Sequence, residues 1–236
     1  MSSGIFDGKG NPATMPMTWL LDFDDTLVRG GITWALEEAF PVLIRDHRLP
    51  FDQARFVQLV LVAQERGSLE ADPRPILRSL FTDMGWPAAL GEQFLQDLIT
   101  TYRPHVYDDA WTFLGRLNAA GHHAYIVSNN PRSPALAQKL GLADLVVRVL
   151  TQSICPGSLP KPDRSLWDHL QTLIESPVPQ NRVAIVGDDP WSDGIFAENC
   201  GLPCYIVDRS QRFQSMHGAK AYRWVSSLSE IPVSGL

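Results

Sequence analysis

Short apolar runs alternate with segments of helical periodicity along most of the chain. Five runs have the length of a strand, and they are continuous rather than alternating, which is typical of strands buried on both faces of a parallel sheet. They lie at 17–22, 123–128, 145–150, 182–186 and 203–207. Helical periodicity separates or precedes the later strands at 108–120, 134–140, 163–175 and 192–199. This alternation predicts right-handed crossovers and an α/β fold with a doubly wound parallel sheet.

The interval after the first strand differs, because no apolar run of strand length interrupts its helical pattern. Between Trp34 and about Tyr102 the periodicity predicts four helices, at 33–47, 52–66, 75–84 and 88–102. Glycines and prolines stand at several of their expected ends. We therefore expect an α-helical cap domain at 31–103, inserted into a catalytic core that consists of residues 17–30 and 104–236.

The first residues carry a different composition. Residues 1–16 are rich in glycine, proline and small polar types, which predicts a disordered leader. They lack the charged-then-apolar pattern of a signal peptide, and no apolar run elsewhere is long enough to span a bilayer. The three cysteines show no metal-type spacing. These observations favour a cytoplasmic protein without a membrane partner.

Composition and charge narrow the expected partners. The chain has 236 residues, of which 44% are hydrophobic and 19% are charged, so it can bury a sizeable core. Its net charge is −6, and no cluster of lysine and arginine stands out. Nucleic acid is not an expected partner, because its binding requires concentrated positive charge. The oligomeric state cannot be read from the sequence.

Carboxylates gather where predicted strands end. Asp22 closes the first strand, Asp24 follows it, and Asp188 and Asp189 follow the strand at 182–186. Ligands of such sheets bind beyond the carboxyl ends of the strands, so these side chains are expected at one site. Neighbouring carboxylates repel unless a proton or cation lies between them. A magnesium ion with oxygen ligands would satisfy them, and a carboxylate can also act as a nucleophile toward phosphorus.

Two further elements complete a set of groups suited to phosphoryl transfer. Ser128 and Asn129 follow the strand at 123–128 and can donate hydrogen bonds. Lys161 lies in a proline-flanked loop, where its ammonium could neutralise a nucleophilic carboxylate and a phosphoryl oxygen. With the aspartates, these residues supply a nucleophile, an acid, a metal site and a positive clamp.

Four motifs in this order resemble those of the haloacid dehalogenase (HAD) superfamily, and specifically its phosphatases with a small helical, C1-type cap. The segment LLDFDDTL from Leu20 to Leu27 is similar to the first motif, Asp-x-Asp-x-Thr. Ser128 stands where the second motif places a serine or threonine at a strand end, and Lys161 stands for the third. The segment GDDPWSD from Gly187 to Asp193 is similar to the fourth. The resemblance implies a Rossmann-like core and covers most of the chain.

The resemblance also implies roles at the matching positions. Asp22 would be the nucleophile that forms an aspartyl-phosphate, and Asp24 would protonate the leaving group and then activate water. Magnesium would be held by Asp22, by Asp188 and by the backbone carbonyl of Asp24. Four residues would bind the phosphoryl group, and one of them, Thr26, would also hold the loop in shape. These are Thr26, Ser128, Asn129 and Lys161. Asp189 and Asp193 would be auxiliary, either touching the metal or orienting its waters.

The expected function is magnesium-dependent hydrolysis of a small, soluble phosphorylated metabolite. A haloacid dehalogenase is an alternative, but such enzymes lack the second aspartate of the first motif, and Asp24 is present. A phosphomutase is a further alternative. A phosphonate hydrolase of this family would use a Schiff-base lysine in the cap, and the stretch from Trp34 to Tyr102 contains none. A binding module that retains the fold without turnover is the last alternative.

Overall fold

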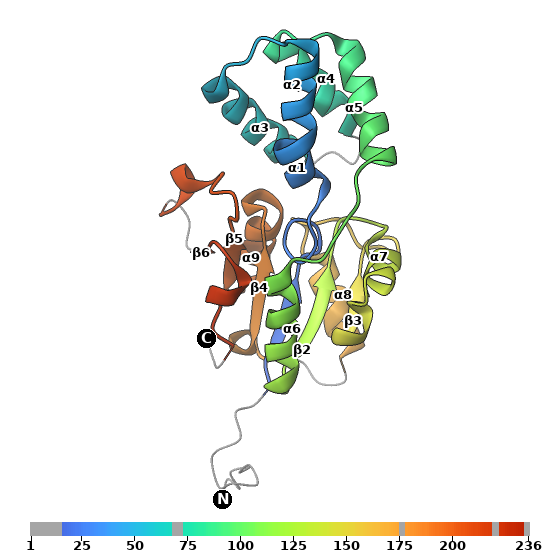
Figure 1. Ribbon diagram of the computed structural model, residues 1–236. Coiled ribbons are helices and arrows are strands. Elements are labelled where there is room, and N and C mark those ends of the chain that lie inside the picture. Colours follow the sequence, from blue (N-terminus) through green and yellow to red (C-terminus); the bar gives the residue numbers. More distant parts are fainter. Residues whose placement is uncertain (1–15, 68–72, 175–177, 219–221, 234–236) are drawn as a thin grey trace, which may run out of the picture.

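Six parallel strands form the centre of the core (Figure 1). The computed structural model describes residues 16–67, 73–174, 178–218 and 222–233, so the predicted leader lies outside them except for Pro16. The sheet order is β3-β2-β1-β4-β5-β6, which reverses direction between β1 and β4. The strands are β1 (Thr18–Leu21), β2 (His123–Val127), β3 (Arg148–Leu150), β4 (Val183–Gly187), β5 (Cys204–Val207) and β6 (Arg223–Val225). This topology confirms the predicted doubly wound α/β fold.

Side chains of β1 explain why its sequence is continuously apolar. Trp19 and Leu21 point into the hydrophobic core on one face of the sheet, and Leu20 points into the core on the other. Helices α6 (Asp108–Ala119) and α7 (Ser133–Lys139) contribute to the first of these cores. Helices α8 (Ser165–Leu173) and α9 (Ile195–Cys200) contribute to the second. A strand that is covered on both faces has apolar side chains on both, so polar and apolar residues do not alternate along it.

Several predicted boundaries need correction. The strand expected at 145–150 is only the three residues of β3, because a 3-10 turn at Ala143–Leu145 precedes it. The helix expected at 192–199 begins earlier, as a π-helical turn at Pro190–Gly194 that continues into α9. Strand β6 was not predicted, because three residues are too few to show a pattern.

Helices α1 to α5 form a separate bundle, which lies above the carboxyl edge of the sheet (Figure 1). Their bounds are α1 (Gly31–Trp34), α2 (Phe40–His47), α3 (Gln53–Gly67), α4 (Pro73–Met84) and α5 (Ala88–Thr100), with a π-helical turn at Ala35–Ala39 between α1 and α2. We keep the name cap for this bundle. The exact domain boundaries at residues 30/31 and 103/104 remain a prediction.

Aromatic rings fill the interior of the cap. The rings of Phe40 and Phe94 stack with centroids 4.7 Å apart, and Phe81 meets Trp86 edge-on at 5.3 Å. All residues of this hydrophobic cluster belong to the cap. The cap therefore has its own core, which supports its treatment as a unit distinct from the sheet.

Two antiparallel linkers join the cap to the core. Val28 and Val106 form a β-bridge. Hydrogen bonds flank the bridge, because the Arg29 N–H donates to the His105 carbonyl at 2.8 Å and the Tyr107 N–H donates to the Leu27 carbonyl at 3.0 Å. The outgoing and returning segments therefore leave the sheet side by side.

Candidate active site

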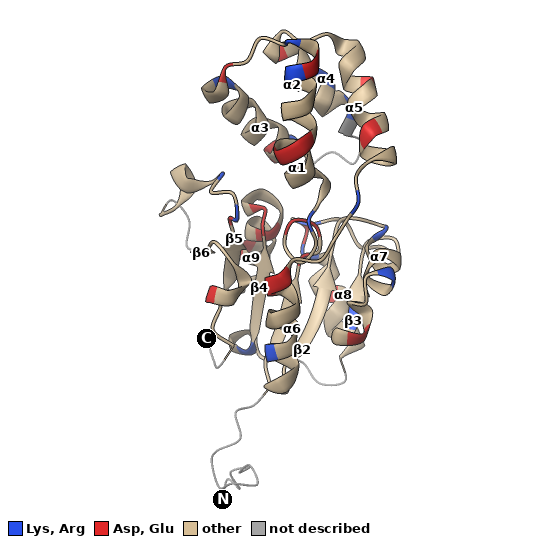
Figure 2. Cartoon of the chain, in the orientation of Figure 1, with Lys and Arg blue, Asp and Glu red and all other residues tan. Residues whose placement is uncertain are grey.

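Three carboxylates meet where β1 and β4 end. The strands pair in parallel, and the Asp22 N–H donates to the Val186 carbonyl at 2.8 Å, so Asp22 and Asp188 emerge side by side. One oxygen from each of Asp22, Asp188 and Asp193 lies within 4.8 Å of the others. Figure 2 shows acidic residues in the loops at this edge of the sheet, facing the cap. The predicted convergence of the motif-one and motif-four aspartates is therefore present in the geometry.

Asp193 approaches this group closely because residue 187 is glycine. A Cβ at Gly187 would lie 2.1 Å from the Asp193 carboxylate carbon, which no neighbouring atom can accommodate without moving. The carboxylate of Asp193 is 2% exposed and also accepts a hydrogen bond from the Asp189 N–H. Asp193 thus lies inside the acidic group rather than at its periphery.

Lys161 lies between two of these carboxylates. Its Nζ is 2.6 Å from Oδ1 of Asp22 and 2.5 Å from Oδ1 of Asp193, and its side chain is 2% exposed. Burial by itself would lower the Lys161 pKa, but the charges of Asp193 and Asp22 outweigh it and raise the pKa above its usual value. The ammonium is therefore a fixed positive charge beside Asp22.

Asn129 fixes the loop that carries this lysine. Its side-chain oxygen accepts from the Lys161 N–H at 2.7 Å, and its side-chain nitrogen donates to the Lys161 carbonyl at 2.8 Å. The side-chain nitrogen also donates to the Ser192 Oγ at 3.4 Å, so the Asn129 carboxamide is engaged within the protein. Ser128 is buried, and its Oγ accepts from the Asn130 N–H at 3.0 Å.

Asp24 lies outside the acidic trio and has its own partner. Its Oδ2 accepts a hydrogen bond from the side chain of Asn130 at 2.8 Å. Burial raises the Asp24 pKa to about 6, although the Asn130 hydrogen bond acts to lower it. A carboxyl group with a pKa near neutrality can both donate and accept a proton at physiological pH.

Burial also disfavours the charged forms of two members of the acidic trio, Asp22 and Asp188. The Asp22 pKa rises to about 8, because desolvation outweighs the attraction of Lys161. The Asp188 pKa is raised well above its usual range by burial and by the nearby Asp25 and Asp22. Carboxylates held this way would be stabilised by an additional cation.

Thr26 and Asp189 mainly shape the loops around these carboxylates. The Thr26 hydroxyl is fully buried and donates to Oδ1 of Asp188 at 3.4 Å. Asp189 caps the following π-helical turn, since its Oδ1 accepts from the N–H groups of Trp191 and Ser192. Burial raises the Asp189 pKa to about 6. Asp22 and Lys161 contact each other directly, so neither Thr26 nor Asp189 lies between them.

Sequence reasoning missed Asp25, which links the catalytic loop to the cap. Asp25 has a φ of 57° and is 4% exposed. Its carboxylate accepts hydrogen bonds from the N–H groups of Gly30, at 2.8 Å, and Thr33, at 3.3 Å. A Cβ at Gly30 would lie 2.9 Å from the Asp25 carboxylate carbon, so glycine is required here for close approach. The sequence did carry a signal for this residue, because Asp25 directly follows Asp24 as the third aspartate of the first motif.

Two arginines after β5 were also missed. Arg209 binds both carboxylate oxygens of Asp109, at 2.7 and 2.9 Å, and donates to the Thr26 carbonyl at 2.9 Å. Its guanidinium carbon lies 3.9 Å from the ring centre of Tyr107. Arg212 lies 3.4 Å from Oδ2 of Asp188. No sequence signal marks these residues, because their partners lie about 20 to 180 positions away.

Comparisons with known proteins place this geometry in a family. The family model for haloacid dehalogenase-like hydrolases matches residues 17–201. The chain therefore belongs to the haloacid dehalogenase-like hydrolase family, as its motifs indicated. No curated protein matched the chain.

Solved structures share the fold at low sequence identity. YfnB of Bacillus subtilis, assigned as a HAD hydrolase and bound to magnesium, is 17% identical, with a TM-score of 0.61 over 92% of this chain and 97% of that one. A predicted phosphoglycolate phosphatase from Haemophilus somnus is 16% identical, with a TM-score of 0.57 over 92% and 96%. A 2-haloacid dehalogenase from Pseudomonas syringae is 17% identical, with a TM-score of 0.51 over 92% and 96%. These likenesses establish the fold and leave the reaction open.

Within the described part of the chain, no helix has the length and apolar character needed to cross a membrane.

Proposed function

We propose that this hydrolase cleaves phosphomonoesters of small, soluble metabolites through an aspartyl-phosphate on Asp22. The observation that carries the proposal is the division of the carboxylates into two environments. Asp22 faces the buried ammonium of Lys161, whereas Asp24 is held by Asn130 and has a pKa of about 6. A nucleophile next to a fixed positive charge, with a separate acid–base group, is the arrangement that covalent phosphoryl transfer requires.

In the first step, a carboxylate oxygen of Asp22 attacks the phosphorus atom. The new bond joins Asp22 to phosphorus, the bond between phosphorus and the ester oxygen breaks, and Asp24 donates its proton to the departing alkoxide. The backbone N–H of Asn129, the hydroxyl of Ser128 and the ammonium of Lys161 are proposed to bind the phosphoryl oxygens. Positive charge fixed before the reaction lowers the cost of the charge that develops on those oxygens.

In the second step, water hydrolyses the aspartyl-phosphate. Asp24, now ionised, accepts a proton from the water as it attacks phosphorus, and the bond from phosphorus to Asp22 breaks. Phosphate leaves, and both aspartates return to their starting protonation states. Asn130 orients Asp24 in both steps, because its amide N–H donates to Oδ2.

The donor set suits a magnesium ion. All the candidate ligands are oxygens, and burial raises the pKa of Asp22 and Asp188 in a way that a divalent cation would reverse. We propose that Asp22, Asp188 and the backbone carbonyl of Asp24 hold the ion, with Asp193 beside them. When bound, magnesium supplies positive charge that offsets the repulsion between the phosphoryl group and the carboxylates.

The alternatives make different use of the same residues. A haloacid dehalogenase needs no general acid at position 24, and the half-buried, hydrogen-bonded Asp24 favours the phosphatase instead. A phosphonate hydrolase would require a lysine that the cap sequence lacks. A phosphomutase would transfer the phosphoryl group back to its substrate rather than to water, and a silent binding module would release no phosphate.

The test is phosphate release from a panel of phosphorylated sugars, short organic acids and mononucleotides, with 2-chloropropionate as the dehalogenase control. We expect release of phosphate from at least one ester, its loss after exhaustive chelation, and its return with magnesium. Chloride release from 2-chloropropionate without phosphatase activity would favour the dehalogenase. Full activity after chelation would refute the proposed role of magnesium.

A further inference from the structure

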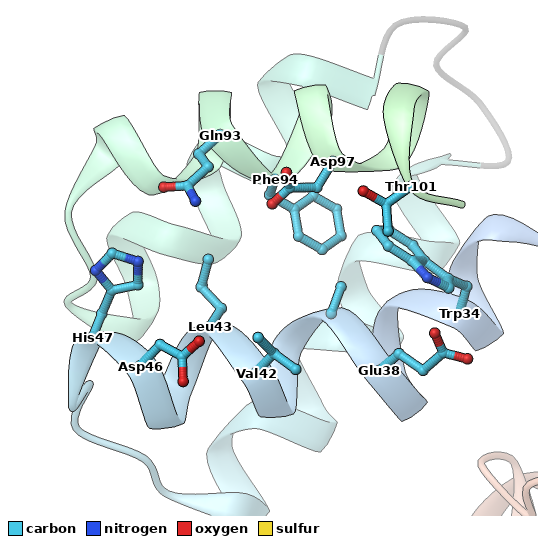
Figure 3. A pocket seen from close by; sticks show the side chains of 11 residues that line it. Trp34, Glu38, Val42, Leu43, Asp46, His47, Gln93, Phe94, Asp97 and Thr101 are labelled. Atoms are coloured by element: carbon cyan, nitrogen blue, oxygen red, sulfur yellow. The ribbon is translucent and has the colours of Figure 1, made fainter. Parts of the chain in front are cut away.

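The cap contains a pocket of about 290 Å³ that is separate from the site described above (Figure 3). Helix α2 and the turns before it form one wall, and helix α5 with the residue after it forms the other. All the lining residues belong to the cap. The proposed catalytic residues therefore do not line it.

The floor of the pocket is apolar and aromatic. Trp34, Leu43 and Phe94 line it, and each is 4 or 5% exposed. The rings of Trp34 and Phe94 lie 6.0 Å apart. This floor can cover the hydrocarbon body of a ligand, and aromatic faces also attract cations.

One polar group on this floor has no partner. The indole N–H of Trp34 makes no hydrogen bond within the described residues, although the side chain is almost fully buried. Figure 3 shows the indole nitrogen at the pocket surface, on the side of Glu38. This nitrogen is not one of the buried polar atoms that lack a partner among the described residues, so water can reach it, and the N–H reports on the pocket without selecting its ligand.

The charge of the pocket is one-sided. Three carboxylates line it, from Glu38, Asp46 and Asp97, and no lysine or arginine does. Glu38 pairs with Arg29 at 2.8 Å, and Asp46 pairs with its neighbour Arg45 at 2.7 Å.

Asp97 differs from the other two carboxylates. Its side chain has no cationic partner in the described part of the chain. Asp97 and Phe94 both belong to α5, three positions apart, and both line the pocket (Figure 3). The uncompensated negative charge of the pocket is therefore centred on Asp97, next to its aromatic floor.

We propose that this pocket binds a small amphipathic cation, in which an aromatic ring carries an ammonium group. The ammonium would face Asp97, and the body would cover Trp34, Leu43 and Phe94. A carboxylate on the same body would be repelled by Asp97, because Glu38 and Asp46 are already paired with arginines. A neutral analogue would gain only the apolar contact.

The test uses three probes that share one ring: 2-phenylethylamine, 2-phenylethanol and 3-phenylpropionate. Binding to the full chain is followed by ¹H–¹⁵N NMR at the indole N–H of Trp34, identified as the signal that Trp34→Phe removes. We expect the amine to shift this signal and to bind about tenfold more tightly than the alcohol at low salt, with the acid weaker still. Asp97→Asn should abolish the preference for the amine, and Asp83→Asn, outside the pocket, should preserve it.

Two results would overturn the proposal. One is equal affinity for the amine and the acid in the unmodified protein. The other is an unchanged preference for the amine in Asp97→Asn. Phosphate release from a generic ester, measured in parallel, separates this question from the proposed function, because no pocket residue belongs to the catalytic set.

Discussion

The core and the cap are organised by opposite kinds of interaction. At the carboxyl edge of the core, buried charges face one another, and each has a specific partner, as Lys161 has in Asp22 and Asp193. In the cap, stacked and edge-on rings fill the interior, and none of the charged residues that the structure describes there is buried. The core is therefore built for a reaction at fixed charges, whereas the cap provides shape and apolar surface.

The first test of this difference is at Asp22, the proposed nucleophile. Asp22→Asn should lower kcat/KM for p-nitrophenyl phosphate by about 10⁴-fold or more, because an amide cannot form the aspartyl-phosphate, which is an acyl phosphate. The matched control is Asp144→Asn, at an exposed position of the core, which should leave the rate unchanged. Circular dichroism should show both variants folded. A rate for Asp22→Asn within a hundredfold of the unmodified enzyme would contradict the assignment.

A second test removes the buried cation. Lys161→Met leaves the carboxylates of Asp22 and Asp193 buried without a positive partner, so the free energy of unfolding should fall by roughly 3–5 kcal/mol. The measurement is urea unfolding with chelator present. Lys139→Met, at an exposed position of α7, should change it by less than about 0.5 kcal/mol. Equal stability of the two variants would mean that the core charges need no partner.

A third test asks whether the cap core is independent. Phe81 is fully buried within the cap cluster, and Phe81→Ala should cost about 3 kcal/mol by leaving a cavity. Hydrogen exchange should show faster exchange in the cap amides and unchanged exchange in β1 and β4. Phe113→Ala, in the sheet core, is the matched variant and should produce the reverse pattern. A uniform response to either change would show that the two cores unfold as one.

The pH dependence of the free energy of unfolding gives a smaller test of the charged core, at Asp109. Partial burial would raise its pKa, but hydrogen bonds from Arg209 and Ser227 outweigh burial and hold the pKa below its usual range. A lowered pKa stabilises the fold above the unfolded value near 4 and loses that effect as pH falls through the folded value. Asp109→Asn should therefore cost about 1–2 kcal/mol at pH 7 and progressively less below about pH 4.

Asp108→Asn is the control for this pH test. Asp108 is exposed in the first turn of the same helix, so its replacement should have a small effect at every pH. A cost of Asp109→Asn that grows on acidification would contradict the account.

The sequence predicted the site in the core better than it predicted the packing of the cap. Asp22 and Asp188 follow predicted strands, so the sheet rule was enough to bring them together. Lys161 was added for its charge, and Asp193 was placed near them only through the resemblance of the fourth motif, as an auxiliary residue. The aromatic contacts of the cap join helices that are distant in sequence, and periodicity predicts the helices but not which rings meet. Strand β6 was too short to show a pattern, and Asn130 was passed over beside the recognised Ser128 and Asn129.

Residues that act through distant partners were the least predictable. Arg209 contacts Thr26, 183 positions away, and Asp109, 100 positions away. Nothing local in the sequence distinguishes it from a surface arginine. Its role emerges only once the loop after β5 is folded against the catalytic loop and α6.

The most direct test of the central claim is to trap the phosphoryl group on Asp22. Asp24→Asn retains the nucleophile but lacks the base that activates water, so a labelled ester with a good leaving group, such as 2,4-dinitrophenyl [³²P]phosphate, should leave label on the protein after acid quenching. The account predicts a label that hydroxylamine removes, that mass spectrometry maps to Asp22, and that is absent when Asp22 is also replaced by asparagine. Label on another residue, or consumption of the ester with no labelled protein at any time, would contradict it.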